Sequence, residues 1–208
     1  MKKIFLHGSG HRSSSWQETI SHMADREDIL CPELSSLLDG QAATYKNLYA
    51  SFTRYCGRTD RQIHLCGISL GGILALNYAI DHPQKVRSLV LIGTPHQIPK
   101  VTFGIQTIFF RFLPKSMFEA MAFDKRNTFF LGNSMKHLDL SGRVESISCP
   151  TLILCGKRDR ANMQSAYYLS ENIKNSELKF IENTGHVVNE ESPEVLANIL
   201  TGFYSLHV

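Results

Sequence analysis

Short runs of hydrophobic residues alternate with longer stretches of helical spacing along most of the chain. Most of the short runs are nearly continuously apolar, which is typical of strands buried on both faces of a parallel sheet. The alternation of strand and helix predicts βαβ units, with helices covering both faces of the sheet. We expect strands at residues 3–7, 29–32, 63–68, 88–93, 151–155 and 178–181.

The stretches between these runs predict helices. Thr44 is placed to cap a helix with an apolar face. Residues 70–80 are apolar nearly all round, which predicts a helix buried in the middle of the domain that ends before Pro83. Near the end of the chain, Ser192 is predicted to be the N-cap and Pro193 the first residue of a closing helix. The predicted helices follow Thr44 and span residues 70–80, 162–173 and 193–206.

Residues 96–140 interrupt this alternation. They include "VTFGIQTIFFRFLPKSMFEAMAF", which is rich in Phe, Ile and Met, where a simple doubly wound fold needs only a short connection. We therefore predict a short helical cap inserted into a single domain of residues 1–208. A membrane span is not expected, because Lys100, Arg111 and Pro114 interrupt the run before the ~20 apolar residues that a span needs.

Length and composition are consistent with one globular domain. The 208 residues can bury a substantial core, and 43% hydrophobic with 20% charged residues is typical of soluble globular proteins. The net charge of +3 comes from 22 basic and 19 acidic residues scattered along the chain. A nucleic-acid binder would cluster its basic residues on one face, so we predict no nucleic-acid partner.

The N-terminus and the cysteines indicate a reducing compartment. In "MKKIFLHGSG" two lysines precede only three strongly apolar residues, which is too short for a secretion signal, and a cytoplasmic location is predicted. The five cysteines form an odd set without a C-x-x-C pair, and most lie in apolar runs. We interpret them as buried free thiols rather than disulfides or zinc ligands.

The sequence Gly67-Ile68-Ser69-Leu70-Gly71 is the first candidate for chemistry. A Gly-x-Ser-x-Gly pattern alone is weak, because on the order of one chain in ten of this length contains it by chance. Here, however, the strand predicted at 63–68 leads into the motif and a helix starts directly after Ser69, which is the setting of a nucleophile elbow. A capping serine in a glycine-rich turn remains the alternative at this point.

A serine nucleophile needs a histidine base and an acid that orients it. Asp159 follows the apolar run "TLILCG", and His186 follows "LKFIENT", so both lie just past a predicted strand. The order Ser69, Asp159, His186 is characteristic of one fold. Asp81 and Asp124 are the next acids to consider, but the first lies at a helix end and the second within the predicted cap.

Four motifs in this order resemble the α/β-hydrolase superfamily over nearly the whole chain. They are an oxyanion loop "FLHGSG", an elbow "GISLGG", an acid strand "CPTLILCGKRD" and a histidine loop with closing helix "GHVVNEESPEVLANILTGF". The resemblance implies an α/β fold with a doubly wound, mostly parallel sheet. The strand before "HGSG" starts at once, so we expect a sheet of about six strands that lacks the family's first antiparallel strands.

The resemblance also implies a role for each site residue. Ser69 would be the nucleophile, His186 the general base and then acid, and Asp159 the carboxylate that orients the imidazole. The backbone N–H groups of Ser9 and Leu70 would form the oxyanion hole. No metal ion or organic cofactor is implied.

The substrate-binding residues are less well determined. The apolar cap either lines an acyl pocket or closes its own small core, and both interpretations stay open. His7 and His11 stand four apart on a glycine-rich loop rather than a helix, so a metal pair is not expected. Glu190 and Glu191 are predicted to support the N-terminus of the last helix rather than to transfer protons. The candidate substrate-binding residues are His7, Phe103, Phe109, Phe110, Met117 and Met121.

Together these observations predict a serine hydrolase that cleaves a small carboxylic ester or thioester through an acyl-enzyme. Two alternatives remain. The same triad could hydrolyse a carbon–carbon bond or eliminate from an acyl compound, because fold does not set function. A non-catalytic ligand-binding protein on a hydrolase scaffold is the second, and it would be expected to have lost a triad member.

Overall fold

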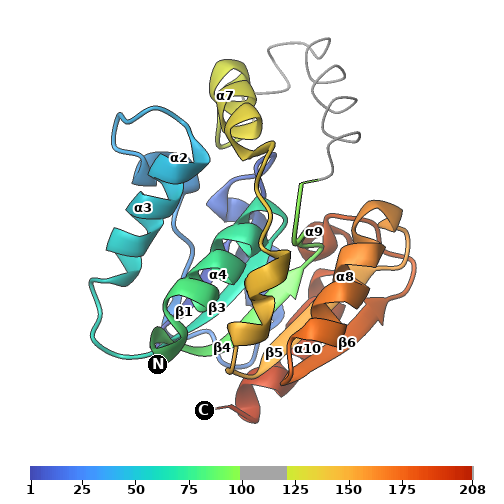
Figure 1. The fold of residues 1–208 in the computed structure, drawn as a ribbon. Coiled ribbons are helices and arrows are strands. Elements are labelled where there is room, and N and C mark those ends of the chain that lie inside the picture. Colours follow the sequence, from blue (N-terminus) through green and yellow to red (C-terminus); the bar gives the residue numbers. More distant parts are fainter. Residues whose placement is uncertain (99–120, 208) are drawn as a thin grey trace.

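The computed structural model describes residues 1–98 and 121–207 and contains one parallel sheet (Figure 1). Its six strands lie in the order β2-β1-β3-β4-β5-β6, and each neighbouring pair is parallel. This confirms the predicted α/β fold class. The strands are β1 Lys3–Leu6, β2 Ile29–Leu30, β3 Ile63–Ile68, β4 Val86–Ile92, β5 Thr151–Gly156 and β6 Ser176–Ile181.

The strand boundaries differ from the prediction at both sheet edges and at the central strand β4, which begins at Val86 rather than Ser88 and ends at Ile92. The edge strand β2 has two residues rather than four, since Pro32 cannot donate a backbone hydrogen bond. The other edge strand, β6, begins at Ser176 instead of Leu178. Its residues alternate between half-buried and exposed, so polar residues belong to a strand that an apolar run alone does not reveal.

The four predicted helices are confirmed. Thr44 caps the first of them, because its Oγ1 accepts the N–H of Asn47 at 3.2 Å. Ser192 stands at the N-cap position of the last helix but makes no capping bond; its hydroxyl lies 2.6 Å from that of Thr184 instead. The helices are α3 Tyr45–Cys56, α4 Leu70–Asp81, α8 Arg160–Asn172 and α10 Pro193–Ser205.

Several further helices were not predicted, and most of them are too short for a repeating pattern to be recognised. The 11-residue helix α7 belongs to the segment predicted as the cap, and Figure 1 shows it at the top of the molecule, the end towards which the strands run. The additional elements are α1 Gln17–His22, α2 Leu34–Leu37, α7 Lys125–Met135, α9 Val188–Glu191, and the 3₁₀ turns η1 Ser13–Trp16, η2 Pro83–Lys85 and η3 Ser141–Ser146.

Side chains from the two faces of the sheet form two separate core clusters. On β1, Ile4 and Leu6 belong to the cluster under α3, α4 and α8, whereas Phe5 belongs to the cluster under α1 and α10. Phe5 packs edge-on against Trp16, with ring centroids 5.0 Å apart. Burial on both faces explains why these strands are continuously apolar in the sequence.

The two ends of the predicted cap segment meet beside the sheet. Gln97 pairs with Asp139 as an antiparallel bridge, and the N–H of Ile98 donates to the carbonyl of Leu138 at 3.0 Å. The segment between them therefore leaves and rejoins the domain at one place. None of the helices in the described part of the chain is long and apolar enough to cross a bilayer.

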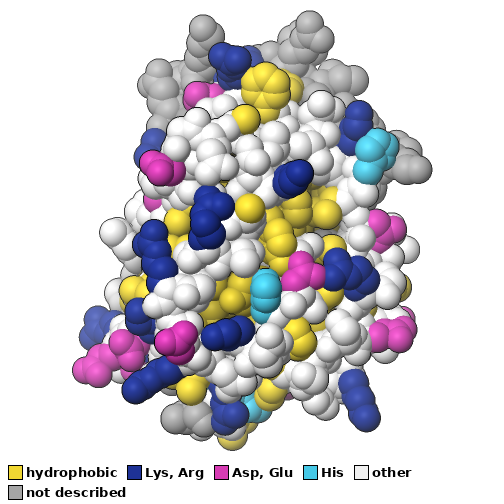
Figure 2. Space-filling model, turned by 60° about the vertical axis from the view of Figure 1, so that its left-hand side comes forward, with side chains coloured by type: hydrophobic (Ala, Val, Ile, Leu, Met, Phe, Trp, Pro, Cys, Tyr) yellow, Lys and Arg dark blue, Asp and Glu magenta, His cyan; other side chains and the backbone are white. Residues whose placement is uncertain are grey.

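Charged side chains of both signs are interspersed on the face drawn in Figure 2, around a central group of hydrophobic side chains. Cys31 is half-buried, the other four cysteines are buried, and all five are free thiols.

The buried histidine His64 on β3 should make the fold sensitive to acid. Its Nδ1 lies 2.7 Å from the hydroxyl of Ser88, and burial, together with nearby positive charge, lowers the pKa of His64 to about 4. The unfolded chain binds a proton below about pH 6.5, whereas the folded chain does not until about pH 4. Stability therefore falls as pH drops through this window, by about 2 kcal/mol at about pH 5.

His64→Gln should remove this part of the acid sensitivity. Urea unfolding of both proteins at about pH 7 and about pH 5 measures it, and the loss between the two conditions should be smaller in the variant by about 2 kcal/mol. Equal losses in both proteins would show that His64 does not stay neutral in the fold.

Candidate active site

The candidate residues follow strands that end at the same edge of the sheet. His7 comes directly after β1, Ser69 after β3 and Gly93 after β4. Asp159 and His186 lie in the loops after β5 and β6. Because all of these strands are parallel, their carboxyl ends meet at one edge, where open α/β sheets place their ligands.

Ser69 occupies a strained turn between β3 and α4. Its φ of 55° and ψ of −116° lie in a backbone region that residues other than glycine rarely adopt. A Cβ on Gly67 would lie 2.3 Å from the carbonyl oxygen of Gly71, and one on Gly71 would lie 2.2 Å from that of Leu6. Glycine is required at both positions because a side chain there would clash with these carbonyl oxygens. The Ser69 side chain does not cap α4, which favours a nucleophile elbow over a capping serine.

The acid and the histidine form a hydrogen-bonded pair. Nδ1 of His186 lies 2.7 Å from Oδ2 of Asp159, whose side chain is 4% exposed, against 39% for the histidine. An ionised carboxylate only accepts hydrogen bonds, so Nδ1–H is the donor. The Nε2 atom of the ring is then the nitrogen that can accept a proton.

Asn162 is a member of this site that sequence reasoning missed. From the first turn of α8 its Nδ2 donates to both oxygens of Asp159, at 3.0 and 2.9 Å. Burial opposes ionisation of Asp159, but the hydrogen bonds from His186 and Asn162 outweigh it and hold the pKa of the carboxyl below its usual value. Its position three residues after Asp159 in a helix is the signal that could have found it.

Gly93 lies close to both the His186–Asp159 pair and Ser69. The N–H of Ser69 donates to the carbonyl of Ile92 at 3.0 Å, so the elbow lies directly beside the end of β4. A Cβ on Gly93 would lie 3.0 Å from Nδ1 of His186 and 3.1 Å from Oδ2 of Asp159. The structure thus places the three predicted triad residues around the adjacent ends of β3 and β4.

The loop after β1 lies against Ser69. A Cβ on Gly8 would lie 3.5 Å from the Cβ of Ser69, and Ser9 follows directly in this loop, whereas the oxyanion hole formed by Ser9 and Leu70 stays a prediction. His7 is fully buried beneath this loop. Its Nδ1–H donates to the carbonyl of Gly8 at 2.8 Å, and its Nε2 accepts the N–H of Leu34 at 3.1 Å.

Burial lowers the pKa of His7, although the carboxylate of Glu33, whose Oε1 lies 2.9 Å from Nε2 of His7, acts in the opposite direction. The contacts of His7 with the backbone of Gly8 and Leu34 shape the loop, and its role in substrate binding stays a prediction.

Comparison with known proteins identifies the family. The family model described as "Alpha/beta hydrolase family" matches residues 4–199. The chain belongs to this family. The predicted family, and with it the prediction of an enzyme, are therefore confirmed.

Three similar proteins illustrate the range of this hydrolase family. Monoacylglycerol lipase abhd6-A of Xenopus laevis is 24% identical, over 97% of this chain and 74% of the relative. The putative 2-succinyl-6-hydroxy-2,4-cyclohexadiene-1-carboxylate synthase of Bacillus subtilis (strain 168) is 25% identical, over 68% of this chain and 65% of the relative. The esterase EaEST from Exiguobacterium antarcticum has the same fold, with a TM-score of 0.79, 16% identity, and coverage of 99% and 92%.

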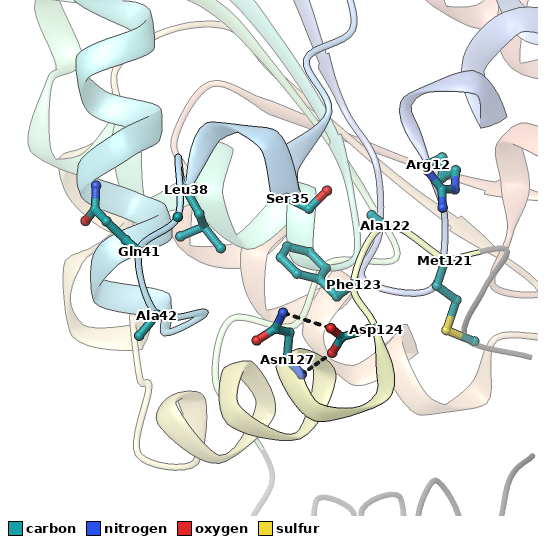
Figure 3. Close-up of a pocket in the computed structure, with 11 residues that line it drawn as sticks. Arg12, Ser35, Leu38, Gln41, Ala42, Met121, Ala122, Phe123, Asp124 and Asn127 are labelled. Carbon is teal, nitrogen blue, oxygen red and sulfur yellow. Dashed lines mark hydrogen bonds between the residues drawn. The ribbon is translucent and has the colours of Figure 1, made fainter. Parts of the chain in front are cut away.

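Met121 is the one predicted substrate-binding residue of the cap that lies within the described ranges. It lines a cavity of about 570 Å³ between α2 and the start of α7, shown in Figure 3. The triad residues do not line this cavity, so a role for Met121 in binding stays a prediction. Other lining residues include Arg12, Leu38, Phe123 and Asp124. Phe103, Phe109, Phe110 and Met117 lie outside the described residues.

The two other candidate acids, Asp81 and Asp124, have structural partners away from the candidate site. Asp81 accepts hydrogen bonds from Tyr49 and Arg143 at the end of α4, and Asp124 caps α7 through the N–H of Asn127 at 2.7 Å. Within residues 1–98 and 121–207, no group of three or more His, Cys, Asp or Glu side chains could hold a metal ion.

Proposed function

We propose that the protein is a serine hydrolase that cleaves a small carboxylic ester or thioester through an acyl-enzyme on Ser69. The observation that carries the proposal is the His186–Asp159 pair, 2.7 Å apart, over Gly93 and beside the strained Ser69. A buried ionised acid, an imidazole with one free nitrogen and a serine at a helix N-terminus are the parts that acyl transfer needs.

In this mechanism Nε2 of His186 takes the proton of the Ser69 hydroxyl as the oxygen attacks the acyl carbonyl. The tetrahedral oxyanion is stabilised by the N–H groups of Ser9 and Leu70, together with the N-terminus of α4. The imidazolium then protonates the leaving alcohol or thiol, and the acyl group stays on Ser69. Water, deprotonated by His186, attacks the acyl-enzyme. The bond between the acyl carbon and Oγ of Ser69 then breaks, His186 returns the proton to Oγ, and the carboxylic acid is released.

The relatives support an ester as the substrate. One is named a monoacylglycerol lipase and a protein of the same fold is named an esterase. Because one relative is named a synthase rather than a hydrolase, elimination from an acyl compound by the same triad is the second candidate.

A series of p-nitrophenyl esters from acetate to decanoate tests the proposal. We expect turnover with a preference among chain lengths, and burst release of p-nitrophenol, because this good leaving group makes acylation faster than hydrolysis of the acyl-enzyme. The absence of ester turnover by a folded protein would contradict the proposal. In that case, a test for elimination from an acyl compound and a test for tight ligand binding without turnover would distinguish the alternatives.

A further inference from the structure

The carboxylate of Glu191 binds the backbone on both sides of His186. Its Oε2 accepts the N–H of Gly185 at 2.7 Å, and its Oε1 accepts the N–H of Val187 at 3.1 Å. Glycine at 185 permits this approach, because a Cβ there would lie 2.9 Å from Oε1 of Glu191. The two oxygens thus hold the peptide groups that flank the candidate base.

The helix that carries Glu191 is itself anchored. In α9, Val188 is fully buried, and Nδ2 of Asn189 donates to the carbonyl of Ser15 at 2.9 Å. The hydroxyl of Thr19 donates to the carbonyl of Asn189 at 3.0 Å. Ser15 and Thr19 belong to the segment that follows the predicted oxyanion loop. Through these hydrogen bonds, α9 connects the loop that carries His186 to this segment.

Besides Glu191, backbone contacts hold the peptide groups on each side of His186. On the upstream side, the N–H of Arg158 donates to the carbonyl of Thr184 at 2.9 Å, and Gly156 packs closely against the carbonyl of Gly185. On the downstream side, the carbonyl of Val187 accepts the N–H groups of Glu190 and Glu191 at 3.0 and 2.8 Å, and the Glu191 side chain binds the N–H of Val187. The Glu191 carboxylate is thus a side-chain contact that links the residues before and after the base.

We infer that Glu191 is a positioning residue for the reaction: its carboxylate fixes the backbone on either side of His186 and so keeps the imidazole aligned between Asp159 and Ser69. This inference rests on the proposed function. Glu191 does not itself transfer protons, since both of its oxygens accept backbone hydrogen bonds. Its role differs from the predicted support of the last helix, because it acts on the loop before α9 instead of on α10.

Glu191→Gln tests this inference. The amide keeps one oxygen as an acceptor but presents an NH₂ group to the other N–H, so one bond is lost with little change in volume. We expect kcat for p-nitrophenyl acetate to fall by about 10- to 100-fold, with KM within about twofold of wild type, because misplacement of a base slows chemistry more than binding. Glu191→Asp keeps the charge and should recover part of the loss.

Glu190→Gln is the matched control, because it removes the same charge one position earlier. Glu190 makes only a 3.9 Å approach to His11 among the ion pairs described, and it makes no bond to residues 185 or 187 through its side chain. It should retain wild-type kcat. Circular dichroism and thermal unfolding show whether each variant is folded.

Gly185→Ala gives an independent test, because its Cβ would displace the Glu191 carboxylate. It should lower kcat in the same way, and the double variant Gly185→Ala/Glu191→Gln should be no slower than Glu191→Gln alone. The inference is overturned if folded Glu191→Gln and Gly185→Ala keep wild-type kcat, or if Glu190→Gln loses as much activity as Glu191→Gln. Ester turnover that survives Ser69→Ala would instead overturn the proposed function, which separates the two failures.

Discussion

Ser69→Ala is expected to lower kcat for ester hydrolysis by about 10⁴- to 10⁶-fold, because it removes the atom that forms the acyl-enzyme. The fold should change little. Alanine and serine carry the same strain at a φ of 55°, and the Ser69 side chain makes no capping bond to α4 that the variant would lose. Thermal unfolding should therefore give nearly the same midpoint for both proteins.

Initial rates with p-nitrophenyl acetate measure this effect. Ser14→Ala is the control, since Ser14 is an exposed serine in η1 and should leave the rate unchanged. If the folded Ser69→Ala variant kept more than about a tenth of the wild-type rate, another residue would have to be the nucleophile.

Asp159→Asn should lower kcat by about 10³- to 10⁴-fold, with a much smaller change in KM. The amide cannot stabilise the imidazolium by charge, and its NH₂ group can donate to Nδ1 and so favour the wrong tautomer of His186. The NH₂ group of Asn162, which now faces two carboxylate oxygens at 3.0 and 2.9 Å, would also lose one acceptor.

The pH dependence of stability provides a second readout for Asp159. Because its pKa is lowered in the fold, the carboxylate contributes stability that is fully present above its usual pKa of 3.8 and is lost as pH falls through the folded value. Asp159→Asn lacks this contribution. Asp81→Asn serves as the control for activity: it should lower stability through its bonds to Tyr49 and Arg143 but keep kcat. Near-normal kcat in Asp159→Asn would mean that another acid orients His186.

The sequence predicts the central strands well because burial on both faces leaves a clear physical signal. Every residue of β3 and β5 is buried, and these strands are apolar runs with nearly the predicted bounds. The edge strand β6 was predicted too short because only some of its residues meet the core. The four-residue helices α2 and α9 span only about one turn, which is too short for a repeating pattern, and their packing rather than their sequence determines them.

In the candidate site, too, some features could be predicted from the sequence and others could not. Ser69, Asp159 and His186 could be predicted because each stands where a parallel strand ends, and those ends must meet. The bond from Asn162 to Asp159 joins residues three apart at the start of α8, so its spacing could have indicated it, whereas the bonds from Glu191 to the histidine loop depend on how that loop packs against α9. The predicted cap residues Phe103, Phe109, Phe110 and Met117 remain predictions.

Reaction with a fluorophosphonate, followed by intact-mass measurement of the wild type and of Ser69→Ala, tests the central claim most directly. The probe reacts with a serine only when a base activates its hydroxyl. We predict a single adduct on the wild type, located on Ser69 by peptide mapping, and none on the folded variant. A wild-type protein that forms no adduct, or a variant that forms the same adduct, would contradict an activated nucleophile at Ser69.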